Sequence, residues 1–142
     1  MLYIGIDPDT EASGVAFWNS FSKSLTFITL RFFELFNELK IKQLLNTGLL
    51  KVYIEAGWLH GTVSWHYAKN IRTAGRIGNN IGANHETGKK IVEMCKYIGI
   101  DYELVRPVKS KIDAKTFQKI TGVKEKTNQE ERDACMLVFG RK

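Results

Sequence analysis

Four acidic residues, far apart in the chain, each stand where an α/β core would present a side chain. Asp7 ends the apolar segment YIGID, and Glu55 ends the apolar segment VYIE. Glu130 and Asp133 are three residues apart in a segment with the pattern of a closing helix. Because a buried, unpaired carboxylate is costly, acids at the ends of buried strands do not serve stability. This pattern predicts an α/β fold with an acidic site.

Convergence of the four carboxylates would be repulsive without cations. At about 5 Å and an effective dielectric constant near 20, each pair costs roughly 3 kcal/mol. Carboxylate oxygens without histidine or cysteine partners favour Mg²⁺, with Mn²⁺ able to substitute, over zinc. Two such ions, about 3.5–4 Å apart, suit in-line displacement at phosphorus. We expect Asp7 to bridge both ions, Glu55 to bind one, and Glu130 with Asp133 to bind the other.

Simpler interpretations of these acids stay open. Asp7 or its neighbour Asp9 can cap the turn after the first strand, and Glu55 can pair with a lysine. Glu130 and Asp133 lie near a helix N-terminus, where the helix dipole favours acids.

Other catalytic patterns are absent from the sequence. There is no P-loop and no plausible Ser/His/Asp arrangement. His60, His66 and His85 lack metal-ligand spacing, so we interpret them as loop or packing residues, although His60 or His66 could contact a phosphate. No small-molecule cofactor is expected.

Charge is concentrated in the C-terminal third. The 142 residues carry a net charge of +6, and residues 106–142 hold ten Lys/Arg against five Asp/Glu. A basic third beside an acidic site indicates a polyanion, and nucleic acid above all, although a solvated helix face is the simpler alternative. The basic residues that flank the site are Arg106, Lys109, Lys111, Lys115, Lys119, Lys124 and Lys126.

Length and composition predict one folded domain over residues 1–142, with 44% hydrophobic residues and only two prolines. No apolar run is long enough to cross a membrane. Cys95 and Cys135 are interpreted as reduced core thiols, which suggests a reducing, cytoplasmic setting.

Periodicity predicts a mixed sheet with helices on both faces. In this arrangement the first strand is central, with Asp7 beside Glu55, and the last helix lays Glu130 and Asp133 across them. Asn19–Ser24 is expected to be a polar hairpin, and Thr127 or Asn128 the N-cap of the last helix. The expected strands are Leu2–Asp7, Val15–Asn19, Leu25–Thr29, Lys51–Glu55 and Asp101–Val105. The expected helices are 33–45, about 68–98, 109–120 and about 128–139.

The long helix contains glycines at 75, 78, 82 and 88, each costing about 1 kcal/mol relative to alanine. Close approach of another backbone would explain them. The alternative is a break in the helix near Asn84. Residues 57–67, which precede this helix, are expected to form an aromatic, glycine-bearing loop whose role the sequence leaves open.

Three segments together resemble one known family. The strand-turn-strand IGIDPD…SGVA (residues 4–16), VYIE (52–55) and EERDA (130–134) resemble, in order, the opening strands, the second acidic strand and the closing helix of RuvC-type Holliday junction resolvases. That family belongs to the ribonuclease H-like superfamily. The resemblance spans nearly the whole chain, although each segment is short.

The resemblance implies a ribonuclease H-like fold and a Mg²⁺-dependent homodimer that nicks four-way DNA junctions, leaving 5′-phosphate and 3′-hydroxyl ends. It places Asp7, Glu55, Glu130 and Asp133 on the catalytic, metal-binding positions.

Trp58 falls where the family has an aromatic that wedges into the junction, and an exposed indole can stack on an unpaired base. The alternative is that Trp58 anchors its loop in the core. Lys109 resembles a lysine near the scissile phosphate, and the glycine-bearing helix resembles the dimer-forming helix. The DNA-binding residues expected on charge and resemblance are Trp58, Lys109, Lys111, Lys115, Lys124 and Lys126.

The chain departs from the family in three ways. Glu130 replaces an aspartate, the loop after Trp58 is longer than in typical bacterial members, and the chain is compact, as in phage-borne relatives. Alternatives are therefore a ribonuclease H-type enzyme that cuts RNA in hybrids and a non-catalytic module that binds branched DNA. The sugar kinase and actin-like ATPase group also has an aspartate on its first strand before a glycine-bearing turn. Those proteins need two such domains around the nucleotide, whereas this sequence predicts one.

Overall fold

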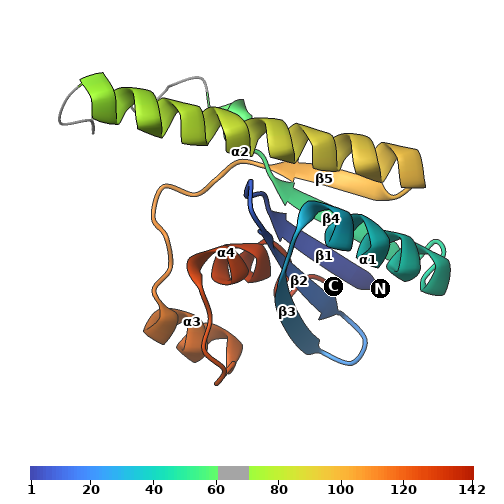
Figure 1. The fold of residues 1–142 in the computed structure, drawn as a ribbon. Coiled ribbons are helices and arrows are strands. Elements are labelled where there is room, and N and C mark those ends of the chain that lie inside the picture. The colour runs from blue at the N-terminus through green and yellow to red at the C-terminus, as the bar shows by residue number, and fades with distance from the viewer. Residues whose placement is uncertain (61–70) are drawn as a thin grey trace.

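A five-stranded mixed sheet forms the centre of the protein (Figure 1). The structure is a computed structural model, and it describes residues 1–60 and 71–142. The strand order is β3-β2-β1-β4-β5, with β1 antiparallel to β2 and parallel to β4. The strands are β1 (Leu2–Asp7), β2 (Ser13–Asn19), β3 (Ser24–Leu30), β4 (Leu50–Glu55) and β5 (Asp101–Val105). The central position of β1, with Asp7 and Glu55 at the same edge of the sheet, confirms the prediction.

Helices cover both faces of the sheet, as the sequence predicts. On one face, α1 (Phe32–Leu45) and α2 (Ile71–Ile98) enclose an apolar core around Ile4, Leu39 and Ile91. On the other face, α3 (Ala114–Thr121) and α4 (Gln129–Val138) pack around Phe117 and Ala134. Figure 1 shows α2 running along β5 and extending past the sheet at its N-terminal end. The alternation of apolar residues along β1 and β4 supplies both cores, because successive side chains point to opposite faces.

The predicted helix over residues 109–120 begins later than expected. It starts at Ala114 because Asp113 is its N-cap, whose carboxylate accepts a hydrogen bond from the Thr116 amide at 2.8 Å. Residues 109–113 are therefore an irregular segment. The last helix agrees with the prediction, and Asn128 is its N-cap, bonded to the Glu131 amide.

The long helix α2 is continuous through Asn84, so the predicted alternative of a break there is wrong. Its expected first residues, 68–70, lie outside the described residues, as does most of the aromatic loop. The beginning of that loop is a 3₁₀ turn, Gly57–Leu59.

The glycines of α2 are of two kinds. A methyl group at Gly88 would overlap the ring of Trp58, so this glycine lets the indole pack against the helix. At Gly75, Gly78 and Gly82 a methyl group would meet none of the described atoms within 4 Å. Within the described chain, the expected backbone contact is therefore not present at these three positions.

Both cysteines are unpaired and fully buried, as predicted, at 0% exposure. Among residues 1–60 and 71–142, no helix combines the length and apolar character that a membrane crossing requires.

Candidate active site

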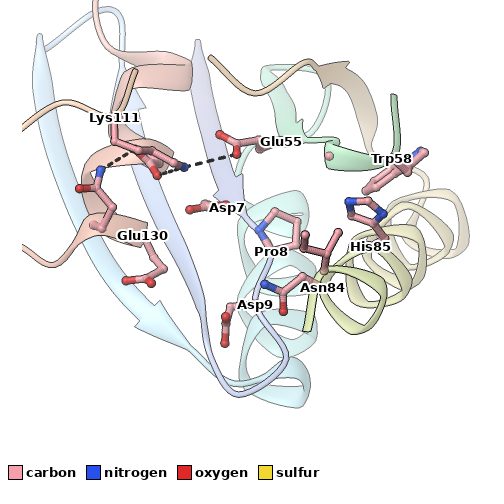
Figure 2. Close-up of a pocket in the computed structure, with 13 residues that line it drawn as sticks. Asp7, Pro8, Asp9, Glu55, Trp58, Asn84, His85, Lys111 and Glu130 are labelled. Atoms are coloured by element: carbon pink, nitrogen blue, oxygen red, sulfur yellow. Dashed lines mark hydrogen bonds and ion pairs between the residues drawn. The ribbon is translucent and has the colours of Figure 1, made fainter. Parts of the chain in front are cut away.

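The four predicted acids line one cleft of about 310 Å³ at the carboxyl ends of β1 and β4 (Figure 2). Asp7 comes from β1, Glu55 from β4, and Glu130 and Asp133 from α4. Figure 2 shows Asp7 between Glu55 and Glu130. We call these four residues the acidic cluster. Their convergence from three elements is what the spacing in the sequence predicts.

Two glycines allow α4 to lie close to the sheet. Gly5 on β1 packs against the Ala134 carbonyl, and Gly14 on β2 packs against the backbone of Glu130. A methyl group at either position would overlap these backbone atoms. The start of α4 is fixed by a capping box, in which Asn128 and Glu131 each bond the other's amide. Close packing and a fixed first turn together set the position of Glu130 and Asp133.

Lys111 lies inside the acidic cluster. Its ammonium hydrogen-bonds to Asp133 Oδ2 and forms an ion pair with Glu55 Oε1 at 3.6 Å. The side chain of Asp133 is only 6% exposed, and that of Glu55 13%. Because ionised carboxylates this deeply placed need a counter-charge, Lys111 stabilises their arrangement.

The segment that carries Lys111 is tied to α4. The Ile112 carbonyl accepts hydrogen bonds from Arg132 Nε at 3.1 Å and from Gln129 Nε2 at 3.4 Å. Gln129 Nε2 also donates to Asp133 Oδ1 at 2.8 Å. These bonds fix the irregular segment 109–113 against the helix that bears two of the acids.

Burial and mutual repulsion perturb the acids. Burial raises the pKa of Asp7 to about 8, and the neighbouring Glu55 carboxylate adds to the rise. Burial also raises the pKa of Glu55, although Lys111 opposes this. Burial alone would lower the pKa of Lys111, but Asp133, Glu55 and Asp7 outweigh it and the pKa is raised. The cluster therefore has an excess of negative charge that one lysine does not neutralise.

Asp9, rather than Asp7, holds the turn after β1. Asp9 Oδ1 accepts hydrogen bonds from the amides of Glu11 at 2.9 Å and Ala12 at 3.5 Å. Asn84 of α2 binds the same turn by accepting from the Thr10 amide at 3.2 Å. The Asp7 carboxylate accepts no hydrogen bond from the part of the chain that the structure describes, so the turn-cap interpretation of Asp7 is wrong.

Trp58 packs against α2 at the end of the cleft opposite Glu130 (Figure 2). Its ring lies edge-on to His85, with 6.3 Å between centroids, and the indole contacts Gly88. The indole is partly buried against the apolar core, and it also lines the cleft. It therefore anchors its loop while keeping part of its surface toward the site.

The other predicted DNA-binding lysines lie outside the cleft. Lys109 is exposed in the irregular segment, two residues before the lysine that does reach the acids. Lys115 is exposed on α3, and Lys124 and Lys126 are exposed between α3 and α4. His60 Nε2 lies 3.1 Å from the Pro107 carbonyl, and His66 lies outside the described residues.

Sequence reasoning missed three polar side chains of the cleft, namely Asn84, His85 and Gln129. Gln129 precedes Asp133 by four positions and so shares its helix face, a signal present in the sequence. Asn84 and His85 carry no such signal, because only the docking of α2 brings them to the cleft.

The donors of the cluster are of one chemical class. All four are carboxylates, and hard divalent cations prefer such oxygen ligands. As the side chains stand in residues 1–60 and 71–142, no three His, Cys, Asp or Glu groups are close enough to hold a metal ion. The Lys111 ammonium lies between two of the four acids, so binding of a metal by all four would require its displacement.

Comparison with known proteins identifies the fold. No family model matches the chain, and no curated protein sequence matches it. A solved structure of Thermus thermophilus RuvC in complex with a Holliday junction substrate is similar, with a TM-score of 0.50 and 17% identity. The similarity covers 96% of this chain and 89% of that one. A second structure of T. thermophilus RuvC is 14% identical over 96% of this chain and 90% of its own, with a TM-score of 0.43.

The first of these similarities, together with the five-stranded mixed sheet and its flanking helices, shows that the chain has the ribonuclease H-like fold of RuvC.

Proposed function

We propose that this protein is a divalent-metal-dependent DNA endonuclease that nicks four-way junctions or other branched DNA, leaving 5′-phosphate and 3′-hydroxyl ends. The observation that carries the proposal is the convergence of four carboxylates from β1, β4 and α4 on one open cleft. The fold supports it, because the similar RuvC structure holds a Holliday junction substrate.

Asp7, Glu55, Glu130 and Asp133 are the residues that would hold Mg²⁺, or Mn²⁺ in its place. Two such ions, when bound, supply an activated water and stabilise the leaving 3′ oxygen. The all-oxygen donor set and the excess negative charge of the cluster support this assignment. Glu130 is partly exposed at the rim of the cleft, so its longer side chain has room to adjust.

The remaining residues position the DNA. Lys111 is suited to contact the phosphate at the cut, because it is the cationic residue that lines the cleft among those that the structure describes. The exposed lysines 109, 115, 124 and 126 would neutralise flanking phosphates. Trp58, which lines the far end of the cleft, would contact a base near the branch point.

We further infer a homodimer, with the cytoplasm of a bacterial cell or phage-infected host as its setting. A dimer with two-fold symmetry suits a two-fold branched substrate. The exposed glycines of α2 leave space for the close approach of a second copy. Light scattering at assay concentration tests the dimer.

A cleavage assay tests the proposed function. Wild-type protein, with Mg²⁺, is incubated with a four-way DNA junction and, separately, with an RNA–DNA hybrid. We expect paired nicks in the junction and no cutting of the hybrid. Asp7→Asn should abolish nicking but retain junction affinity, since it removes a metal-binding carboxylate and leaves the exposed lysines in place. Asp101→Asn, at the opposite end of the sheet, is the matched control and should cut normally.

The other outcomes identify the alternatives. Cutting of the hybrid with an intact junction would indicate a ribonuclease H-type enzyme. Junction binding that is insensitive to Asp7→Asn, without nicking at any Mg²⁺ or Mn²⁺ concentration, would indicate a non-catalytic binding module.

A further inference from the structure

A second hollow opens beside the acidic cleft, between residues 105–113 and α4. It has a volume of about 520 Å³, within the range of pockets that hold small organic groups. It shares Glu55, Lys111 and Asp133 with the acidic cleft, so the two are continuous. We call it the side groove. Its other apolar lining residues are Val105, Val108, Ile112, Met136 and Leu137. The polar ones are Arg106, Ser110, Thr116, Arg141 and Asp113, whose carboxylate is engaged by Thr116 as the N-cap of α3.

Five apolar side chains form a continuous part of the wall of the side groove, and this part is open to solvent. Val108 is 68% exposed and Met136 is 40% exposed, although both are large hydrophobic residues. Val105, Ile112 and Leu137 continue the same surface with partly buried side chains. Exposed apolar side chains that line one hollow favour a ligand with an apolar face.

Cationic groups border this apolar surface. The Arg141 guanidinium carbon lies 3.6 Å from the centroid of the Tyr53 ring, and its Nε donates to the Leu137 carbonyl at 2.8 Å. Arg106 is exposed. Neither arginine forms an ion pair with a carboxylate of the described residues. Arg106 and the Nη groups of Arg141 are therefore available to an anionic group, and a guanidinium also stacks on planar rings.

We propose that the side groove holds one unstacked nucleobase of the cut strand, immediately beside the scissile phosphate. The inference rests on the proposed nuclease function and adds a specificity site to it. A nucleotide combines the two features that the groove accommodates, a planar apolar base and a phosphate. Because the groove begins at Glu55, Lys111 and Asp133, a strand that crosses the acidic cleft reaches it without a bend around another element.

A base enters such a groove only if it leaves its stack, which is easiest where pairing is already interrupted. The groove would thus favour cutting next to a branch point, and its shape would favour some bases over others. This assigns to Val108 and Met136 a role in substrate selection, separate from the chemistry of the acids.

Abasic substrates test the proposal directly. Four-way junctions are prepared with a single base removed at each of the two positions on either side of the cut phosphate. With wild-type protein, we expect removal at one position to lower kcat/KM about tenfold, as for the loss of one stacked base. Val108→Glu, which places a carboxylate in the groove, should lower kcat/KM on the intact junction by a similar factor. It should cause no further loss on the sensitive abasic junction.

Ile120→Glu is the matched control. It adds the same charge at an apolar position of α3 that is 48% exposed and does not line the groove. If wild-type protein cuts all abasic and intact junctions equally, the base-binding role of the side groove is overturned while the proposed nuclease function stands. Equal effects of Val108→Glu and Ile120→Glu would have the same meaning. Failure of wild-type protein to cut the unmodified junction would overturn the proposed function itself.

A spectroscopic readout is independent of cutting. 2-Aminopurine is placed at the sensitive position of a junction bound by Asp7→Asn protein. Its fluorescence should change at least twofold on binding, and adding Val108→Glu should abolish the change. An unchanged signal with Asp7→Asn alone, at a concentration that saturates the junction, would contradict the groove.

Discussion

Gly14 of β2 packs directly against the main-chain carbonyl of Glu130 in α4. This contact fixes how closely the helix, and the acid that it carries, approaches the sheet. Gly14→Ala should therefore push α4 outward and lower the free energy of unfolding by about 1–3 kcal/mol, the usual cost of overpacking. Urea denaturation measures it. Asn37→Ala, at an exposed position of α1, is the control and should not lower the free energy of unfolding, because alanine is the better helix former. Equal effects of the two changes would contradict the contact.

Lys111 provides the counter-charge for two of the acids. In a chelator, Lys111→Met should leave Glu55 and the buried Asp133 unpaired. Since Lys111 is itself 48% exposed, we expect a loss of only about 1–2 kcal/mol of unfolding free energy, less than for a fully buried pair. Mg²⁺ should raise the melting temperature of this variant more than that of wild-type protein. Lys109→Met, which removes an exposed lysine, should change neither quantity; a matching loss there would contradict the role of Lys111.

Stability without metal should depend on the protonation of Asp7. Its pKa is raised from 3.8 to about 8, so the folded protein retains a proton that the unfolded chain releases. The contribution of this group to stability is therefore present at acid pH, and it is lost as the pH rises from about 4 through 8. Asparagine does not titrate, so the Asp7→Asn protein lacks this pH-dependent loss of stability. Its free energy of unfolding relative to wild type should therefore increase between pH 5 and pH 8. Urea midpoints in chelator measure this, and a constant difference would contradict it.

Trp58 has two contacts with different consequences. Its packing on Gly88 and His85 indicates that Trp58→Ala loosens the turn at Gly57–Leu59, whereas Trp58→Phe preserves much of the apolar contact. If the exposed part of the ring contacts DNA, Trp58→Ala should reduce junction turnover more than junction affinity. Single-turnover cleavage and a binding titration separate the two. Unchanged turnover in a folded Trp58→Ala protein would assign the ring to packing alone.

The two thiols should be inert in the folded protein. Cys95 and Cys135 are both 0% exposed, and burial raises the pKa of each to about 12. A thiolate reagent at pH 8 should label neither cysteine in native protein and both in guanidinium chloride. Rapid labelling of the native protein would show that one of the two cores opens.

Much of the candidate site was predictable because its signals are local. Each acid follows or lies within a segment whose periodicity identifies a strand or helix, and neighbouring parallel strands end at one edge of a sheet. Asp7 and Glu55 could thus be placed together from their positions alone. Asn128 could be identified as one of two candidate N-caps because capping depends on residues within one turn.

The sequence by itself determined the order of strands and helices, the acids at their ends and the excess of positive charge in the last third. The tertiary structure decided which lysine reaches the acids, since Arg132 and Gln129 hold Ile112, and so Lys111 rather than Lys109, against α4. It also decided which glycines are in close contact with other segments. The docking of α2 brings Asn84 and His85 to the cleft, and the packing of residues 105–113 beside α4 forms the side groove next to the acids. Periodicity and capping act within a few residues, whereas these features depend on contacts between segments that only the packed chain brings together.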